Sequence, residues 1–98
     1  MEIKGVGVIG GGLMGAGISQ VTAQSGYEVV MVEVSEDLLT RARKGIEQSL
    51  GKLVEKGTIH AATRETALKK LTGTTKLKDL SEVDLVIEAI VEALEVKN

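Results

Sequence analysis

The stretch that most constrains this chain is its glycine-rich beginning, residues 4–20, which reads KGVGVIGGGLMGAGISQ. The glycines at 10, 12 and 15 stand between a short β-branched run at residues 3–9 and a helical pattern at residues 13–25. Glycine in a helix or strand interior costs about 0.5–1 kcal/mol relative to alanine. The cluster therefore brings no gain in stability. It indicates that something other than stability requires the absence of side chains at this place.

Strand-like and helical patterns alternate along the rest of the chain. Ser35 offers an N-cap oxygen to a long amphipathic helix that stops at Gly57. We expect a shorter helix at residues 61–71, strands at residues 27–34, 74–77 and 84–89, and a further helix that starts in the last residues. This order implies parallel pairing with right-handed crossovers. The expected fold class is α/β, a Rossmann-type parallel sheet in the incomplete order 3-2-1-4 with a helix pair inserted after the second strand.

Composition narrows the classes of function. The 98 residues allow one domain, carry a net charge of −2 and include a single aromatic residue, Tyr27. The chain thus lacks the basic surface and the aromatic platforms of nucleic-acid binding, and its core must be aliphatic. There is no cysteine and His60 is the only histidine, so we predict no metal site and treat His60 as a surface residue. With no long apolar run and no signal peptide, we predict a cytoplasmic protein that does not enter a membrane.

Gly10, Gly12 and Gly15 form the pattern G-x-G-x-x-G between the first strand and the first helix. In dinucleotide sites the first glycine permits the tight turn, the second lets a pyrophosphate approach the backbone, and the third lets the helix pack on the strand. The free N–H groups at the helix start then face the phosphates. Glu33 ends the second strand eighteen residues after Gly15, near the spacing expected for a carboxylate on the adenosine ribose. This combination favours a dinucleotide site.

Two other interpretations stay open on these residues alone. Glycine-rich stretches often mark only a tight turn, with no ligand. A methyltransferase also has glycines after its first strand and an acid after its second, although its glycines are usually closer together.

Three segments carry a resemblance that extends over essentially the whole chain. They are VIGGGLMGAGISQVTAQSGYEVVMVEVSED, ARKGIEQSLGKLVEKG and DLVIEAIVEALEVKN, in this order. On these motifs the chain resembles the N-terminal segment of the L-3-hydroxyacyl-CoA dehydrogenases, including bacterial 3-hydroxybutyryl-CoA dehydrogenases. The resemblance implies NAD as the cofactor and an acyl-CoA substrate, which is oxidised from L-3-hydroxyacyl-CoA to 3-oxoacyl-CoA by hydride transfer.

The resemblance also implies site residues at the matching positions. The cofactor would be held by Gly10, Gly11, Gly12, Leu13, Met14, Gly15, Glu33, Glu92 and Lys97, and coenzyme A by Ser49 and Lys56. Glu33 stands where the family usually has aspartate, and Ala93 stands where it often has asparagine. Ser49 and Lys56 are seven residues apart, about two helical turns, so both can face one extended ligand, with a solvated polar face as the alternative.

No catalytic residue is expected in this chain. The resemblance places the family's catalytic histidine, the glutamate that orients it, and their serine and asparagine partners further along, whereas no histidine follows His60 here. We therefore expect residues 1–98 to be the N-terminal part of the NAD-binding domain of a homo-oligomeric enzyme, inactive without its helical dimerisation and substrate domain. The strand at residues 84–89 would then be an open edge that recruits partners. The alternative is a free-standing NAD-binding or redox-sensing module.

Overall fold

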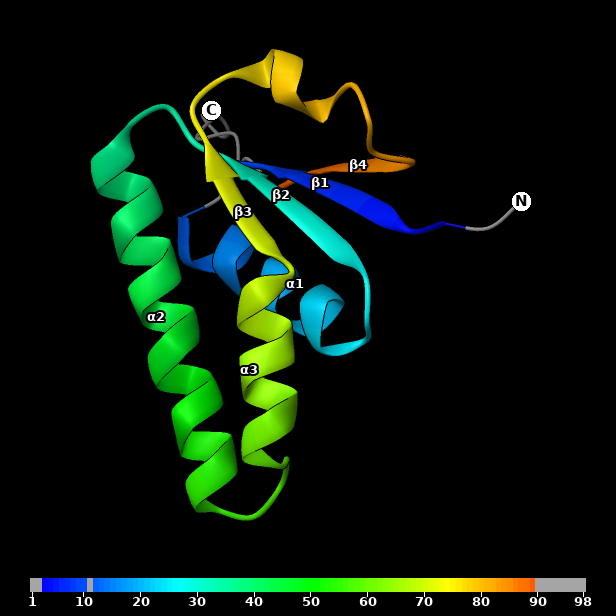
Figure 1. Cartoon of the computed structure of the whole chain (residues 1–98). Helices are drawn as coiled ribbons and strands as arrows, with labels where there is room; N and C mark the ends of the chain where they lie inside the picture. The colour runs from blue at the N-terminus through cyan, green and yellow to red at the C-terminus, as the bar shows by residue number, and fades with distance from the viewer. Residues whose placement is uncertain (1–2, 11, 90–98) are drawn as a thin grey trace, which may run out of the picture.

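The computed structural model describes residues 3–10 and 12–89. They form one parallel sheet of four strands in the order β3-β2-β1-β4. The strands are β1 (Gly5–Ile9), β2 (Glu28–Val32), β3 (Leu71–Thr74) and β4 (Leu85–Glu88). Parallel partners need crossover connections, and helices supply the first two of them (Figure 1). The predicted α/β class and the order 3-2-1-4 are confirmed.

The longer helices lie on one side of this sheet. α1 (Gly12–Gln24) connects β1 to β2, and the pair α2 (Glu36–Glu55) and α3 (Ala61–Lys69) connects β2 to β3. α2 and α3 run side by side and extend beyond the sheet, while the short 3-10 helix η1 (Leu77–Leu80) lies on the opposite side (Figure 1). The predicted helix pair after the second strand is thus confirmed. Within residues 3–10 and 12–89, none of the helices combines the length and the apolar character that crossing a membrane requires.

The predicted N-cap of α2 is present. The Ser35 hydroxyl accepts a hydrogen bond from the backbone N–H of Leu38 at 3.2 Å. Glu36 and Asp37 occupy the first turn, where the positive end of the helix favours acidic side chains. These groups give α2 a well-defined start directly after the end of β2.

The third strand lies at residues 71–74, and the prediction of a strand at residues 74–77 was wrong. Residues 77–80 form η1 instead. Leu71 pairs with Val29 of β2 and is buried, while Leu77 is 62% exposed. Burial of Leu71 in the sheet therefore outweighs the helical pattern that includes it, and α3 ends at Lys69.

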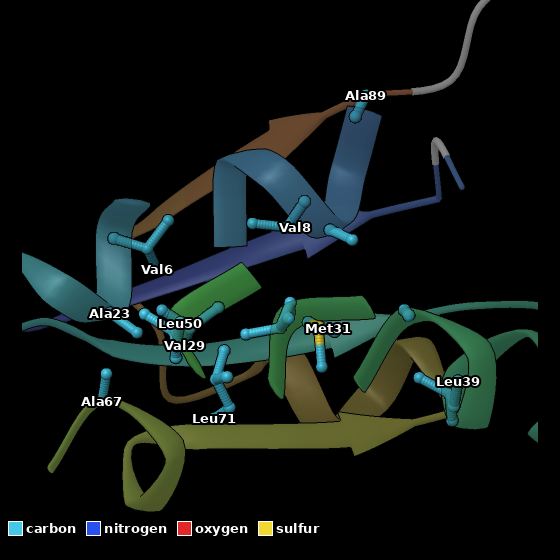
Figure 2. Close-up of a cluster of buried hydrophobic side chains, with 13 residues drawn as sticks. Val6, Val8, Ala23, Val29, Met31, Leu39, Leu50, Ala67, Leu71 and Ala89 are labelled. Atoms are coloured by element: carbon cyan, nitrogen blue, oxygen red, sulfur yellow. The ribbon is translucent and has the colours of Figure 1, made fainter. Parts of the chain in front are cut away.

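The core lies between the sheet and the three helices (Figure 2). The sheet supplies Val6, Val8, Val29, Met31 and Leu71, and α2 supplies Leu39, Ala42, Ile46 and Leu50. The buried apolar side chains of the described residues are aliphatic or methionine, as the composition predicts.

Among the described side chains of α1, those that are fully buried in this core are small, and Ile18 packs against the core while partly buried. Ala16, Ser19 and Ala23 are buried, whereas Met14 and Val21 are 54% and 63% exposed. Two of the apolar residues that predicted the helix thus lie on its outer side. Small inward residues let the helix approach the strands closely, and its position depends on that approach.

Asp84 ties the beginning of β4 to the beginning of β1. Its carboxylate accepts hydrogen bonds from the backbone N–H groups of Lys4 and Gly5, both at 2.9 Å. These bonds, that from Gly5 most of all, hold the pKa of Asp84 below its ordinary value of 3.8. In the described part of the chain β4 lies at the edge of the sheet, and Leu85 and Val86 are 44% and 45% exposed.

Candidate functional site

The carboxyl ends of β1 and β2 lie side by side at one edge of the sheet. Their last residues, Ile9 and Val32, are paired. The backbone N–H of Gly10 donates to the carbonyl oxygen of Val32 at 2.7 Å, so the pairing continues one step beyond β1. The segments that follow the two strands, the glycine loop (residues 10–15) and Glu33, are thereby brought together. In open α/β sheets this is the edge at which ligands bind.

Gly10 and Gly12 both have a left-handed backbone, with φ of 65° and 51°. Glycine adopts this conformation without the steric penalty that a β-carbon brings. Apart from its chain neighbours and the nearby backbone of its own helix, no heavy atom of the described residues lies within 4 Å of the position that a β-carbon on Gly12 would take. That side of Gly12 is therefore open, as the close approach of a pyrophosphate requires.

Gly15, unlike Gly12, has no room for a β-carbon. A β-carbon on Gly15 would lie 2.0 Å from the carbonyl oxygen of Gly10 and 3.7 Å from the β-carbon of Ala89. The first turn of α1 thus packs directly on the end of β1, beside the residue that follows β4. This is the close helix–strand packing that the motif predicts for its third glycine.

Glu33 lies beside the glycine loop and is only 9% exposed. Its Oε2 accepts a hydrogen bond from the backbone N–H of Gly12 at 3.3 Å. Its own N–H donates to the carbonyl oxygen of Thr74 at 3.1 Å, which anchors the residue to the end of β3. The acid after β2 and the second glycine of the motif, 21 residues apart, are therefore in direct contact.

These groups suit a dinucleotide. The start of α1 supplies N–H groups without helical partners, Gly12 leaves room above the backbone, and Glu33 supplies a carboxylate that accepts hydrogen bonds. The structure thus joins Gly10, Gly12, Gly15 and Glu33 in one place, as the spacing predicts. Leu13 and Met14 follow in the first turn of α1, and the Met14 side chain is exposed.

The other predicted site residues lie elsewhere. Ser49 is half-buried in α2, and Lys56 is the exposed C-cap residue of that helix. α2 has 20 residues, so it is about 30 Å long and separates Lys56 from the sheet edge that carries Glu33. The predicted residues Gly11, Glu92 and Lys97 lie outside the described residues.

Two residues beside the glycine loop were not predicted from the sequence. Val34 directly follows Glu33 and is 88% exposed, so it presents an apolar side chain beside the acid. Ala89 follows β4 and comes close to Gly15. Both residues could be found from their positions in the sequence, because each follows a parallel strand whose carboxyl end lies at the ligand-binding edge of the sheet.

Comparison with known proteins identifies the family. The family model described as "3-hydroxyacyl-CoA dehydrogenase, NAD binding domain" matches residues 5–98. The chain belongs to this family. The 3-hydroxyacyl-CoA dehydrogenase resemblance and the NAD cofactor predicted with it are confirmed.

Relatives of this dehydrogenase family are similar over nearly the whole chain. A probable 3-hydroxybutyryl-CoA dehydrogenase from Deinococcus radiodurans is 51% identical over 92 residues, covering 94% of this chain and 33% of that protein. The human mitochondrial hydroxyacyl-coenzyme A dehydrogenase is 48% identical over 102 residues, covering 98% of this chain and 32% of that protein. The crystal structure of (S)-3-hydroxybutyryl-CoA dehydrogenase PaaH1 from Ralstonia eutropha matches with a TM-score of 0.89 at 37% identity, covering 93% of this chain and 32% of that one. The chain therefore spans about a third of the length of these dehydrogenases.

Proposed function

We propose that this NAD-binding domain serves an enzyme that interconverts L-3-hydroxyacyl-CoA and 3-oxoacyl-CoA by hydride transfer. The observation that carries the proposal is the contact between Glu33 and Gly12, because it unites the expected ribose acid and the phosphate loop at one sheet edge. The substrate class is taken from the relatives, two of which are named as 3-hydroxybutyryl-CoA dehydrogenases.

The cofactor is assigned to the glycine loop and its surroundings. Its pyrophosphate is assigned to the backbone of Gly10, Gly11, Gly12, Leu13, Met14 and Gly15, where the open face of Gly12 and the helix start favour an anion. Glu33 accepts hydrogen bonds from the adenosine ribose, and the exposed side chain of Val34 offers an apolar surface to the adenine ring. Glu92 and Lys97 are assigned to the nicotinamide side on the family resemblance alone. When bound, NAD supplies the acceptor of the hydride.

Coenzyme A is assigned to the helix pair. Ser49 and Lys56 offer a hydroxyl and an ammonium group about two turns apart on α2, which suits an extended ligand that carries phosphates. The length of α2 separates this contact from the cofactor edge, so the two ligands do not compete for the same residues. A cytoplasmic location and a homo-oligomeric assembly stay predictions from the sequence.

Because residues 1–98 alone are expected to be inactive, the test uses the whole enzyme of which this chain is the NAD-binding part. It follows acetoacetyl-CoA reduction by the loss of NADH absorbance, together with calorimetric titration of NAD. We expect NAD binding, and we expect Ser49→Ala and Lys56→Ala to raise the KM for the acyl-CoA while the Kd for NAD stays unchanged. Gln48→Ala, on an exposed neighbour in α2, is the matched control. NAD binding with the same KM in all variants contradicts the coenzyme A contact, and absence of NAD binding contradicts the assigned cofactor site.

A further inference from the structure

Glu33 makes a contact that recognition of a ribose does not require. Its Oε2 accepts from the N–H of Gly12, the first residue of α1. We propose that Glu33 is also the positioning residue of the glycine loop: one carboxylate oxygen fixes the start of α1, and the other oxygen is left for the ribose. The inference rests on the proposed NAD site and gives one of its residues a second task.

The start of α1 has no capping side chain of its own. Residues 10–12 are all glycine, and the first turn of α1 contains no acidic residue. The first N–H groups of a helix have no partner within the helix, and they carry its positive end. The carboxylate of Glu33, delivered from the end of β2, satisfies the N–H of Gly12 at 3.3 Å. A side chain from the neighbouring strand therefore acts as the N-cap of α1.

The backbone on the strand side of this contact is fixed to the sheet. Glu33 is 9% exposed, and its N–H is bonded to the carbonyl oxygen of Thr74 at 3.1 Å. The preceding carbonyl, that of Val32, accepts the N–H of Gly10 at 2.7 Å. Gly12 itself has a φ of 51°, a conformation that glycine enters and leaves easily. The bond to Glu33 is thus a contact from the fixed strand end that holds this residue of the loop in one conformation.

One carboxylate has the capacity for both tasks. An ionised carboxylate offers two oxygens with about four acceptor positions, and the donors of the protein and of the ribose do not exclude each other. The positioning task depends on the length of the side chain at position 33. The contact is already 3.3 Å with glutamate, so an aspartate on the same backbone, one methylene shorter, falls outside hydrogen-bond distance of Gly12.

Amide hydrogen exchange of Gly12 in the ligand-free protein tests the positioning contact directly. We expect Glu33→Ala and Glu33→Asp to raise the exchange rate of this N–H about tenfold, and Glu33→Gln, which keeps an acceptor oxygen, to raise it less. Glu36→Ala removes a nearby exposed carboxylate and is the matched control. An unchanged rate at Gly12 in Glu33→Ala overturns the proposal, whether or not the protein binds NAD.

Titration with two ligands tests the consequence for binding. The ligands are NAD and an NAD analogue whose adenosine ribose lacks the 2′- and 3′-hydroxyls. We expect Glu33→Ala to weaken the analogue about tenfold, because the loop is no longer positioned, while Glu33→Gln binds it within about twofold of the parent protein.

If Glu33 serves only the ribose, the analogue binds the parent protein and Glu33→Ala equally, or binds Glu33→Ala more tightly because a negative charge near the phosphates is gone. Either result overturns the proposal. Melting temperatures show whether each variant is folded. If Glu33→Ala is not folded, Glu33→Gln still allows the comparison with the parent protein. Failure of the parent protein to bind NAD contradicts the proposed function instead, and the exchange rate of Gly12 then decides on the positioning role alone.

Discussion

The guanidinium of Arg43, in α2, donates a hydrogen bond to the carbonyl oxygen of Leu68, in the last turn of α3, at 3.1 Å. A second bond of the same guanidinium reaches the carbonyl oxygen of Leu71, the first residue of β3, at 3.3 Å. One side chain of α2 therefore spans the junction at which helix becomes strand. Leu68 lies in the last turn, where carbonyl groups lack the N–H partners of a continuing helix, and the guanidinium adds a charged donor from another helix.

We predict that Arg43→Ala lowers the free energy of unfolding by about 1–2 kcal/mol, because it removes two hydrogen bonds from a charged donor that is partly exposed. Arg43→Lys retains the charge but lacks the planar fork, so it recovers less than half of the loss. Arg41→Ala is the control, since Arg41 pairs with Asp37 on the surface and its side chain is 76% exposed. Urea denaturation measures all three, and equal losses for Arg43→Ala and Arg41→Ala contradict the junction role.

We predict that Gly15→Ala lowers the free energy of unfolding by about 1–3 kcal/mol, since the new methyl group meets the carbonyl oxygen of Gly10 at 2.0 Å and the backbone must shift. The same shift displaces the start of α1, so the Kd for NAD rises at least about tenfold. Thermal denaturation and calorimetric titration measure the two effects.

Gly17→Ala is the matched control for this substitution. Gly17 lies two residues further along α1, and in the part of the chain that the structure describes no heavy atom outside the adjacent backbone is within 4 Å of the position of its added β-carbon. Alanine in an exposed helix interior stabilises by about 0.8–1 kcal/mol relative to glycine. The two glycine substitutions should thus move the melting temperature in opposite directions, and a rise in both would show that the approach of α1 to β1 is not tight.

We predict that the site prefers NAD to NADP by at least about tenfold in Kd. The 2′-phosphate of NADP would meet the carboxylate of Glu33, which is only 9% exposed, whereas the next cationic residue in the sequence, Arg41, is paired with Asp37 at 3.2 Å. Glu33→Ala should weaken NAD by about ten- to a hundredfold and NADP by less. Titration of both cofactors measures the ratio, and equal or tighter binding of NADP by the parent protein would show that Glu33 does not meet the ribose.

We predict that Asp84 makes the stability depend on pH in the acid range. Because hydrogen bonds from Gly5 and Lys4 hold the pKa of Asp84 below 3.8 in the folded protein, the ionised form stabilises the fold above that value, and this contribution is lost as the pH falls through the folded pKa. The melting temperature of Asp84→Ala should therefore lie below that of the parent protein at pH 7, with the difference shrinking below about pH 4. Glu82→Ala, an exposed carboxylate two residues earlier, is the control. A difference that stays constant down to pH 2.5 would rule out the bonded carboxylate as its source.

The elements that the sequence predicted well are those in which local pattern and tertiary burial agree. In α2 the residues Leu39, Ala42, Ile46 and Leu50 repeat with helical spacing, and all four are buried. The glycine motif needs no tertiary information either, because its φ values and its close contact are properties of the turn between β1 and α1. The spacing of Glu33 was sufficient to predict that it lies next to this turn.

The elements that the sequence predicted poorly depend on partners far along the chain. Leu71 fits a helical pattern, yet its pairing with Val29 makes it the first residue of β3. Val21 and Met14 fit the apolar face of α1, but the described residues that are fully buried where this helix approaches the strands are small, such as Ala16 and Ala23. The bond from Gly12 to Glu33 was not predictable, since it depends on the length of one side chain and on the exact path of a glycine backbone.

The position of β1 sets an order for the folding of the sheet. β1 pairs with β2, its neighbour along the chain, and with β4, to which Asp84 adds two bonds that span 79 and 80 residues. Contacts between distant residues form slowly, because the intervening chain must first be ordered. We therefore expect the unit β1-α1-β2 to assemble before β4 joins it and brings Ala89 to the side of Gly15. In that order, the glycine motif is in place at the cofactor edge before Ala89 reaches the side of Gly15.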